Sequence, residues 1–466
     1  MNMIYSFARI RYKTYQNLAN YKTRLAAMRP TKIETTQLDL FKNQLSVQLN
    51  PKHELYKLSN LIPWDRLEKE FNLHDEDQVA GRPSKPVRLM LGIMLLQNMY
   101  NLSDENAVRM WVENPYWQYF CGYNILQWEY PIDPSSLTRW RNRLGPESLE
   151  KLLSMSVDVA VETGTIEKKD LENIIADTTV MPKNIEYPTD AKLLEKARVR
   201  MVKLAKEHNL NLRQNYNFVI KKLLRRLGGY LHAKQMKRAQ KEQKTLRTLV
   251  GRITRDCERQ VANDAKLEVI FKDILSQSNH LLTRKSKDKN KIYSLHEPSV
   301  DCISKGKAHK KYEFGTKVSL TICHRAKGII TSALAIAGNP YDGHTLSEAI
   351  NASERITNQK VKKAFVDKGY KGHGVENTIV YISGQRKDIT SRIKKAMKRR
   401  QAIEPYIGHI KSECKLGLSR LKGIVGDKIN AILSAAAYNL KLIMNHLRVL
   451  FLQILFCIFK NTKFTY

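Results

Sequence analysis

Residues 399–411 of the chain read RRQAIEPYIGHIK and hold a single carboxylate among cations. That carboxylate is Glu404, with Arg400 four residues before it and Lys411 seven residues after it. On a continuous helix these spacings place all three side chains on one face. Pro405 disfavours helical geometry in the residue before it, so the helix either kinks there or begins with Pro405 in its first turn. Both geometries set Glu404 beside cations, as an ordinary surface ion pair would also do.

Two further stretches each combine an apolar, β-branched run with one aspartate. Residues 173–180 read NIIADTTV, with Asp177 inside the run, and residues 364–370 read AFVDKGY, with Asp367 before a glycine turn. Such runs predict strands that carry an acid to the edge of a sheet. A single aspartate of this kind is most often a strand cap or a turn former. Together with Glu404, however, the two supply the hard oxygen ligands of a divalent-metal site that leaves coordination positions for phosphates.

The stretch around Glu404 resembles the third-acid signature of the DDE transposases of bacterial insertion sequences, specifically of the insertion sequence five group. That signature runs Tyr, two residues, Arg, three residues, Glu, six residues, Lys. Arg400, Glu404 and Lys411 match it in spacing, whereas Met397 occupies the tyrosine position. Any role of that tyrosine therefore has no counterpart in this chain.

The two aspartate stretches resemble the other motifs of the same family. Its second-acid motif, Asp-x-Gly-Tyr, is present as residues 367–370, and its first motif, an Asp followed by Thr in a strand, as residues 177–179. The resemblance extends over roughly residues 50 to 445 and is specific, because three motifs occur in order with family-like spacing. It implies an α/β catalytic core of the RNase H-like type, in which the three acids are both the catalytic residues and the metal ligands.

The resemblance also implies a mechanism and its partners. Two Mg²⁺ or Mn²⁺ ions about 4 Å apart would activate the attacking oxygen and neutralise charge at phosphorus, with Asp177 bridging them and Asp367 and Glu404 each completing one. The protein would bind the ends of an insertion sequence, cleave DNA to free 3′-hydroxyls and join them to target DNA. A homodimer is expected, because two DNA ends must be paired.

The composition predicts a polyanionic partner. The 466 residues carry a formal net charge of +35, which indicates binding to nucleic acid. A ribosomal or packaging protein would share this charge but would not need acids at strand ends. The six cysteines are scattered without a CxxC pair, as expected of a reducing compartment and of neither a disulfide framework nor a zinc site. No run of about 18 apolar residues occurs, so we expect a cytoplasmic, nucleoid-associated bacterial protein without a membrane partner.

The length predicts two or three domains. Residues 191–291 carry 27 Lys and Arg against nine Asp and Glu. A solvated helical pair would also be charged, but this one-sided excess favours a DNA-facing helical insertion at about 190–290, before a β-hairpin. We expect a poorly ordered lead-in over residues 1–52, with a second start at Met28, followed by a helical N-terminal domain able to bind DNA over residues 53–165. An RNase H-like catalytic domain that contains the insertion is expected over residues 166–446, and an apolar tail over residues 447–466.

Several basic residues are expected to contact DNA phosphates without reading the sequence. Arg139, Arg141 and Arg143 follow a Ser/Thr-capped helix start, which suits phosphate binding at a helix N-terminus. The remaining candidates lie in a basic loop or flank Glu404, and they are Lys305, Lys307, Lys310, Lys311, Arg400 and Lys411.

Three functions compete on this evidence. The first is a transposase, the second a metal-dependent DNA endonuclease with the same fold that does not join strands, and the third an inactive DNA-binding relic. The helical N-terminal domain and the basic insertion favour the first over the second. The intact set of three acids argues against the third.

Overall fold

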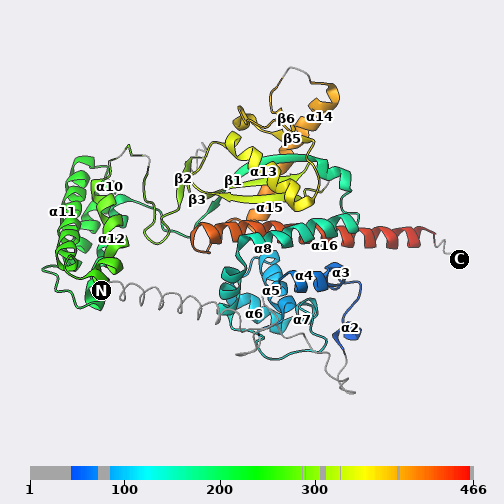
Figure 1. Ribbon diagram of the computed structural model, residues 1–466, viewed down its shortest axis with the longest axis horizontal. Helices are drawn as coiled ribbons and strands as arrows, with labels where there is room; N and C mark the ends of the chain where they lie inside the picture. The colour runs from blue at the N-terminus through cyan, green and yellow to red at the C-terminus, as the bar shows by residue number, and fades with distance from the viewer. Residues whose placement is uncertain are drawn as a thin grey trace, which may run out of the picture.

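The computed structural model describes residues 44–71, 84–285, 287–288, 290–304, 311–325, 327–385 and 389–461, with side chains up to residue 449. A six-stranded mixed sheet lies at its centre (Figure 1). The predicted start at Met28 and most of the predicted lead-in lie outside these residues. The strands are β1 (Asn173–Pro182), β2 (Asp301–Ser304), β3 (Tyr312–Cys323), β4 (Ile330–Ile336), β5 (Lys363–Val366) and β6 (Ile379–Ile382).

The central strand β1 joins two differently built halves of the sheet. It pairs antiparallel with β3 and parallel with β5, and β5 pairs parallel with β6. On its other edge β3 pairs with β2 through residues 312–315 and with β4 through residues 317–322, so β2 and β4 lie end to end. The predicted hairpin is therefore confirmed as β3 and β4, whereas β2 was not predicted.

Helices from the N-terminal part of the chain gather on one side of the sheet. Gly145 divides the longest of them, α8, because its φ of 69° is left-handed and Pro146 follows it. These helices are α2 (Leu45–Gln48), α3 (Glu54–Leu61), α4 (Trp64–Glu70), α5 (Val87–Met99), α6 (Asp104–Glu113), α7 (Pro115–Phe120) and α8 (Pro134–Glu162).

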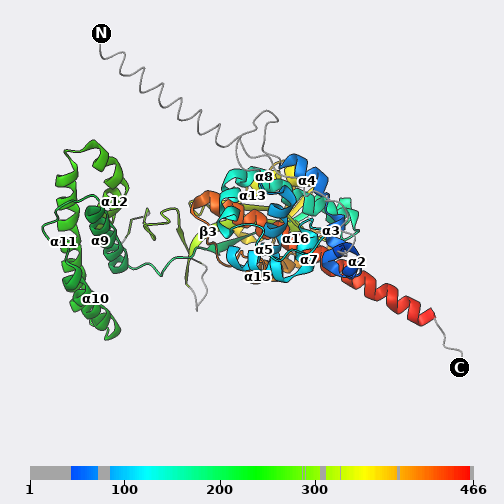
Figure 2. The same ribbon diagram turned by 90° about the horizontal axis from the view of Figure 1, so that it is seen from below.

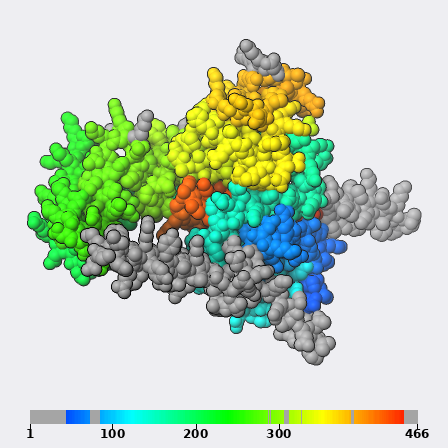
Figure 3. All heavy atoms as spheres, viewed as in Figure 1, coloured from blue at the N-terminus to red at the C-terminus, as the bar shows by residue number. Residues whose placement is uncertain are grey.

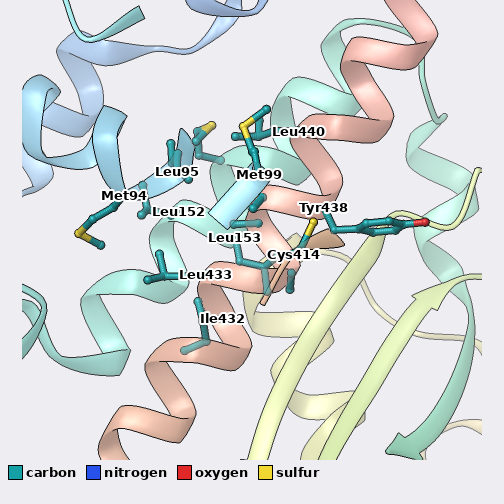
Figure 4. Packing of buried hydrophobic residues seen from close by; sticks show 14 of the residues in the cluster. Met94, Leu95, Met99, Leu152, Leu153, Cys414, Ile432, Leu433, Tyr438 and Leu440 are labelled. Carbon is teal, nitrogen blue, oxygen red and sulfur yellow. The ribbon is translucent and has the colours of Figure 1, made fainter. Parts of the chain in front are cut away.

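The helix α16 (Gly423–Asn461) lies between these N-terminal helices and the sheet. Residues 431–440 are all buried, so this part of the helix has no solvent-facing side, as expected of an apolar helix in a core. Leu433 and Leu440 pack among Leu95 of α5 and Leu153 of α8 in one hydrophobic cluster (Figure 4). The same cluster includes residues of β1, β3 and β4, so the hydrophobic core continues across the predicted boundary at residue 165.

Four helices follow β1 and precede β2, and we call them the helical segment. They are α9 (Asp190–Glu207), α10 (Asn217–His232), α11 (Met236–Val261) and α12 (Ala265–Thr283). Leu194, Leu246 and Phe271 belong to a separate hydrophobic cluster inside the segment. The segment stands to one side of the sheet and of the N-terminal helices (Figures 1 and 2), and forms a lobe of its own in the space-filling view (Figure 3).

A buried ionic cluster lies where the helical segment leaves and rejoins the sheet. Lys183 directly follows β1, Glu297 precedes β2, and Asp427 belongs to α16. The Lys183 Nζ lies 2.9 Å from Asp427 Oδ1 and 3.2 Å from Glu297 Oε2. The three side chains are only 2%, 6% and 0% exposed for Lys183, Glu297 and Asp427. Asp427 lies inside α16, four residues after the helix begins at Gly423, and its carboxylate faces inward.

The remaining elements complete the surroundings of the sheet. They are α13 (Asp342–Thr357), α14 (Ser391–Arg399), α15 (Ile403–Glu413) and the short 3₁₀ turns η1 (Lys168–Glu172), η2 (Lys368–Tyr370) and η3 (Arg400–Ala402). On the face opposite α16, Leu346 and Ile350 of α13 pack against Ile174 of β1 and Val366 of β5. Among the described residues, no helix combines the length and the apolar character that crossing a membrane requires.

Candidate active site

Asp177 and Asp367 stand side by side on two neighbouring strands: Asp177 lies within β1, and Asp367 directly follows β5. Strands β1 and β5 are parallel, and their pairing joins Ile175 to Phe365. Continued by two residues, this register sets Asp177 opposite Asp367, at the spacing of about 4.8 Å between adjacent strands. Because side chains alternate along a strand, both carboxylates belong to the face that carries Ile175 and Phe365.

Backbone hydrogen bonds orient both aspartates. The N–H of Thr178 donates to Asp177 Oδ1 at 2.8 Å, and the N–H of Gly369 donates to Asp367 Oδ1 at 2.8 Å. The second bond makes Asp367 the N-cap of the turn η2, so this residue also has the turn-forming role that the sequence allowed.

The helix that carries Glu404 begins beside Asp177. Arg400 Nη1 lies 3.8 Å from Asp177 Oδ2, and the two side chains are 13% and 20% exposed. The backbone stays helical from Arg400 through η3 into α15, so Glu404 lies one turn beyond Arg400 on the same face. Pro405 occupies the first turn of α15, which confirms the second of the two geometries predicted for it. Glu404 itself is exposed.

A fourth carboxylate, Asp342, contacts the middle of β1 and β3 beside Asp177 and was not predicted. It begins α13, and its Oδ1 accepts hydrogen bonds from Thr178 Oγ1 at 3.0 Å and from Lys317 Nζ at 2.8 Å. Its partner Thr178 is 164 residues away along the chain, so no local pattern could reveal the contact.

Tyr370, in the turn that follows Asp367, has a buried hydroxyl. The side chain is fully buried, and its oxygen has no hydrogen-bond partner within the described part of the chain. Burial raises the pKa of Tyr370 far above its usual value, and the charges of Asp177, Asp342 and Asp367 raise this pKa further. Thr345, which lowers this pKa from nearby, donates its own hydroxyl to the backbone oxygen of Asp342 at 2.8 Å. The charges of all three aspartates therefore act on one buried hydroxyl, that of Tyr370.

The donor atoms suit magnesium or manganese by type, since both prefer carboxylate oxygens. A Cβ at Gly369 would lie 3.0 Å from Asp367 Oδ1 and 3.4 Å from Asp342 Oδ2, so a bare backbone is needed between these two oxygens. As the side chains are arranged, no three Asp, Glu, His or Cys groups of the described residues stand close enough together to hold a metal ion. Binding an ion between Asp177, Asp367 and Glu404 therefore requires their side chains to turn toward one another.

The residues predicted to contact phosphates are scattered over the molecule. Arg400 adjoins Asp177, Lys411 is half-buried on α15, and Lys311 is exposed beside β3. On α8, Arg139 is exposed and Arg143 is half-buried. The other three members of the basic loop, Lys305, Lys307 and Lys310, lie outside the described residues.

The prediction for Arg141 is wrong. Its side chain is only 5% exposed, pairs with Asp104 and donates to Gln97 Oε1 at 3.1 Å. Arg141 lies on the buried face of α8, four residues after Leu137 and three before Leu144, both of which are in the core. Its guanidinium therefore ties α8 to α5 and α6 and is not available to DNA.

A basic pocket of about 390 Å³ adjoins Arg400. It lies between the end of β6 and α14, and α14 carries five basic residues and no acidic one. Met397, at the position of the family's tyrosine, contributes an apolar part of the wall. The lining residues are Ser383, Gly384, Gln385, Ile389, Lys394, Met397, Lys398, Arg400 and Gln401.

Two families match the chain. Residues 43–143 match the family described as "Transposase domain (DUF772)", and residues 280–440 match the "Transposase DDE domain" family. The second match includes Asp342, Asp367 and Glu404, while Asp177 lies before it. The DDE family implies an RNase H-like core, with which the mixed sheet agrees.

One relative is similar to nearly half of the chain. It is an uncharacterized protein, ORF8 in the nfe locus, from Rhizobium meliloti, which is 44% identical over 208 residues. The alignment covers 45% of this chain and 100% of the relative. No solved structure matches the chain. From the two matched domains and this relative, we conclude that the chain belongs to the DDE transposases.

Proposed function

We propose that this transposase binds the ends of an insertion sequence, cleaves the DNA to free 3′-hydroxyls and joins these to target DNA at the site formed by Asp177, Asp367 and Glu404. The observation that supports this most is the meeting of the three elements. Asp177 lies within β1, Asp367 directly follows the adjacent parallel strand β5, and Arg400, one turn before Glu404, lies 3.8 Å from Asp177.

The three acids are proposed to hold Mg²⁺ or Mn²⁺, with two ions expected. A bound pair of such ions would supply charge neutralisation at phosphorus and activation of the attacking oxygen. Arg400 and Lys411 are proposed to hold phosphates on either side of Glu404. The pocket beside Arg400 suits a nucleotide next to the cleaved bond, because it combines cations for phosphate with apolar and amide side chains.

The rest of the chain is proposed to hold DNA around this site. The helical segment would be a DNA-facing insertion of a catalytic domain at 166–446, and its exposed cations on α10 and α11 support this role. The helices of residues 53–165 would form an N-terminal DNA-binding domain in which Arg139 and Arg143 contact phosphates. The protein would act as a homodimer on paired ends, in the cytoplasm and on the nucleoid.

The test uses three amide variants, Asp177→Asn, Asp367→Asn and Glu404→Gln. Each keeps the side-chain shape but removes an anionic ligand, so each should lose cleavage and strand joining at least about a thousandfold while still binding end DNA. The triple variant should be scarcely worse than a single one, because residues that act as one unit are not additive. Labelled end DNA and a target plasmid, with Mg²⁺ or Mn²⁺, report both reactions.

A matched control comes from the same helix. Glu413 also lies on α15, but its carboxylate pairs with His409 Nδ1 at 2.8 Å and with Lys441 of α16. Glu413→Gln should therefore leave cleavage nearly intact, and full activity of Glu404→Gln would remove Glu404 from the site. Cleavage by the natural protein without joined products would favour the endonuclease, and the absence of both reactions would favour the inactive relic.

A further inference from the structure

Asp342 occupies a position behind the two catalytic aspartates. It lies at the start of α13, which covers the sheet face opposite to that of Asp177. Its partners Thr178 and Lys317 lie on neighbouring strands, since Thr179 pairs with Val318 and Val180 pairs with Lys317. One carboxylate thus joins the N-terminus of α13 to both β1 and β3.

The ion pair between Lys317 and Asp342 is mostly shielded from water on the side of the lysine. The Lys317 side chain is 10% exposed, and its Nζ donates to Asp342 Oδ1 at 2.8 Å and to the backbone oxygen of Pro340 at 2.6 Å. Without the charge of Asp342, a cation would remain behind the strand that carries Asp177. Charges at this depth act over several ångströms, because little water screens them.

The second oxygen of Asp342 lies toward the Asp367 turn. Asp342 Oδ2 and Asp367 Oδ1 both lie within 3.4 Å of the point that a Cβ at Gly369 would occupy. Tyr370, whose pKa the charges of the three aspartates raise, belongs to the same turn. Asp342 therefore touches the supports of both catalytic aspartates without belonging to the set of three acids.

We propose that Asp342 is a positioning residue of the transposase site, which holds Thr178 in place and neutralises Lys317 so that Asp177 and Asp367 keep their affinity for a divalent cation. This inference rests on the proposed function, because it assumes that these two aspartates bind the cation. It assigns Asp342 a role through its neighbours and not as a further ligand.

The experiment measures Mn²⁺ binding to the full chain without DNA, by the loss of the electron paramagnetic resonance signal of free Mn²⁺. Asp342→Asn keeps an oxygen that can accept from Thr178 but leaves the charge of Lys317 without an anionic partner, so the Mn²⁺ Kd should rise about tenfold or more. Removing the lysine as well, in Asp342→Asn with Lys317→Met, should restore the Kd to within about threefold of the natural protein. If Asp342 served only to stabilise the fold, removing Lys317 as well would not restore the Mn²⁺ Kd.

Two further variants keep the proposal falsifiable if Asp342→Asn does not fold. Lys317→Met alone should bind Mn²⁺ at least as tightly as the natural protein, and weaker binding would overturn the inference. Glu354→Gln, which changes another carboxylate of α13 that pairs with Lys360, should leave Mn²⁺ binding unchanged. An unchanged Kd in folded Asp342→Asn, or no rescue in the double variant, would also overturn it.

The control for the underlying site is Asp177→Asn with Asp367→Asn. Loss of Mn²⁺ binding in this variant, together with unchanged binding in Asp342→Asn, would refute the role of Asp342 and leave the proposed function intact. If the natural protein and this variant bind Mn²⁺ equally, the cation site itself is wrong, and the inference about Asp342 is overturned with it.

Discussion

Replacing Lys183 by Met should destabilise the protein by about 4 kcal/mol. Lys183 is the cation shared by two buried carboxylates, and its Nζ also donates to the backbone oxygens of Leu421 and Gly423. Removing one partner of a buried ion pair costs about 3–5 kcal/mol, because a charge remains that neither water nor an opposite charge compensates. Here two carboxylates would remain, which places the expected loss in the upper part of that range.

Hydrogen bonds that survive the substitution limit this loss. Asp427 still accepts from Thr316 Oγ1 at 2.6 Å and from Ser419 Oγ at 2.9 Å. Glu297 still accepts from the backbone N–H of Gly423 at 2.9 Å. We therefore expect about 4 kcal/mol rather than the sum of two broken pairs.

Urea unfolding followed by circular dichroism measures the change as a difference in the free energy of unfolding. The matched control is Lys362→Met, which breaks a pair with Glu172 whose side chains are 64% and 31% exposed and should cost less than about 1 kcal/mol. Adding Glu297→Gln and Asp427→Asn to Lys183→Met should recover part of the stability, because no uncompensated charge then remains. A loss no larger than that of the control would refute the reasoning.

Two further predictions concern the basic surface and a buried lysine. Replacing Lys221, Lys222, Arg225 and Lys237, four exposed residues of the helical segment, by Glu should weaken DNA binding and its dependence on salt. The slope of the logarithm of the binding constant against the logarithm of the salt concentration should fall by nearly one unit for each phosphate that is no longer bound. An unchanged slope in a folded variant would show that these charges are only solvated. Burial lowers the pKa of Lys415 to about 8, from about 10.4 in an unfolded chain. Below pH 8 the folded protein must hold this lysine as a buried cation, which costs stability, and the cost disappears as the pH rises to 10. Lys415→Met should therefore be more stable than the natural protein at pH 7, by roughly 1–3 kcal/mol, and this gap in urea-unfolding free energy should close by pH 10.

Strong local patterns made most of the sheet predictable. The predicted β-hairpin corresponds to β3 and β4, and the helical segment precedes it in the chain. β2 was missed because it has only four residues, and it is defined by its pairing with β3. The alternation of apolar and polar residues cannot identify a strand of this length.

The site was predictable where chemistry and spacing coincide in one stretch. Asp177, Asp367 and Arg400 were each recognised from their own stretch, and the structure brings their elements together. Asp342 was missed because its partners Thr178 and Lys317 are distant in the sequence. Arg141 was misassigned because a run of arginines was given more weight than the helical spacing from Leu137 to Leu144, which turns Arg141 inward.

The position of α16 has a consequence for how the protein is made. Its buried residues 431–440 fill the space between the N-terminal helices and the sheet, yet the ribosome synthesises them after all of these elements. Until they emerge, α5, α8 and β4 lack the helix against which they pack, and their apolar faces remain open to water or to chaperones. The helical segment, with its separate core, can fold earlier. The basic helical lobe can therefore form on the nascent chain before the core next to β1 and β4 is closed.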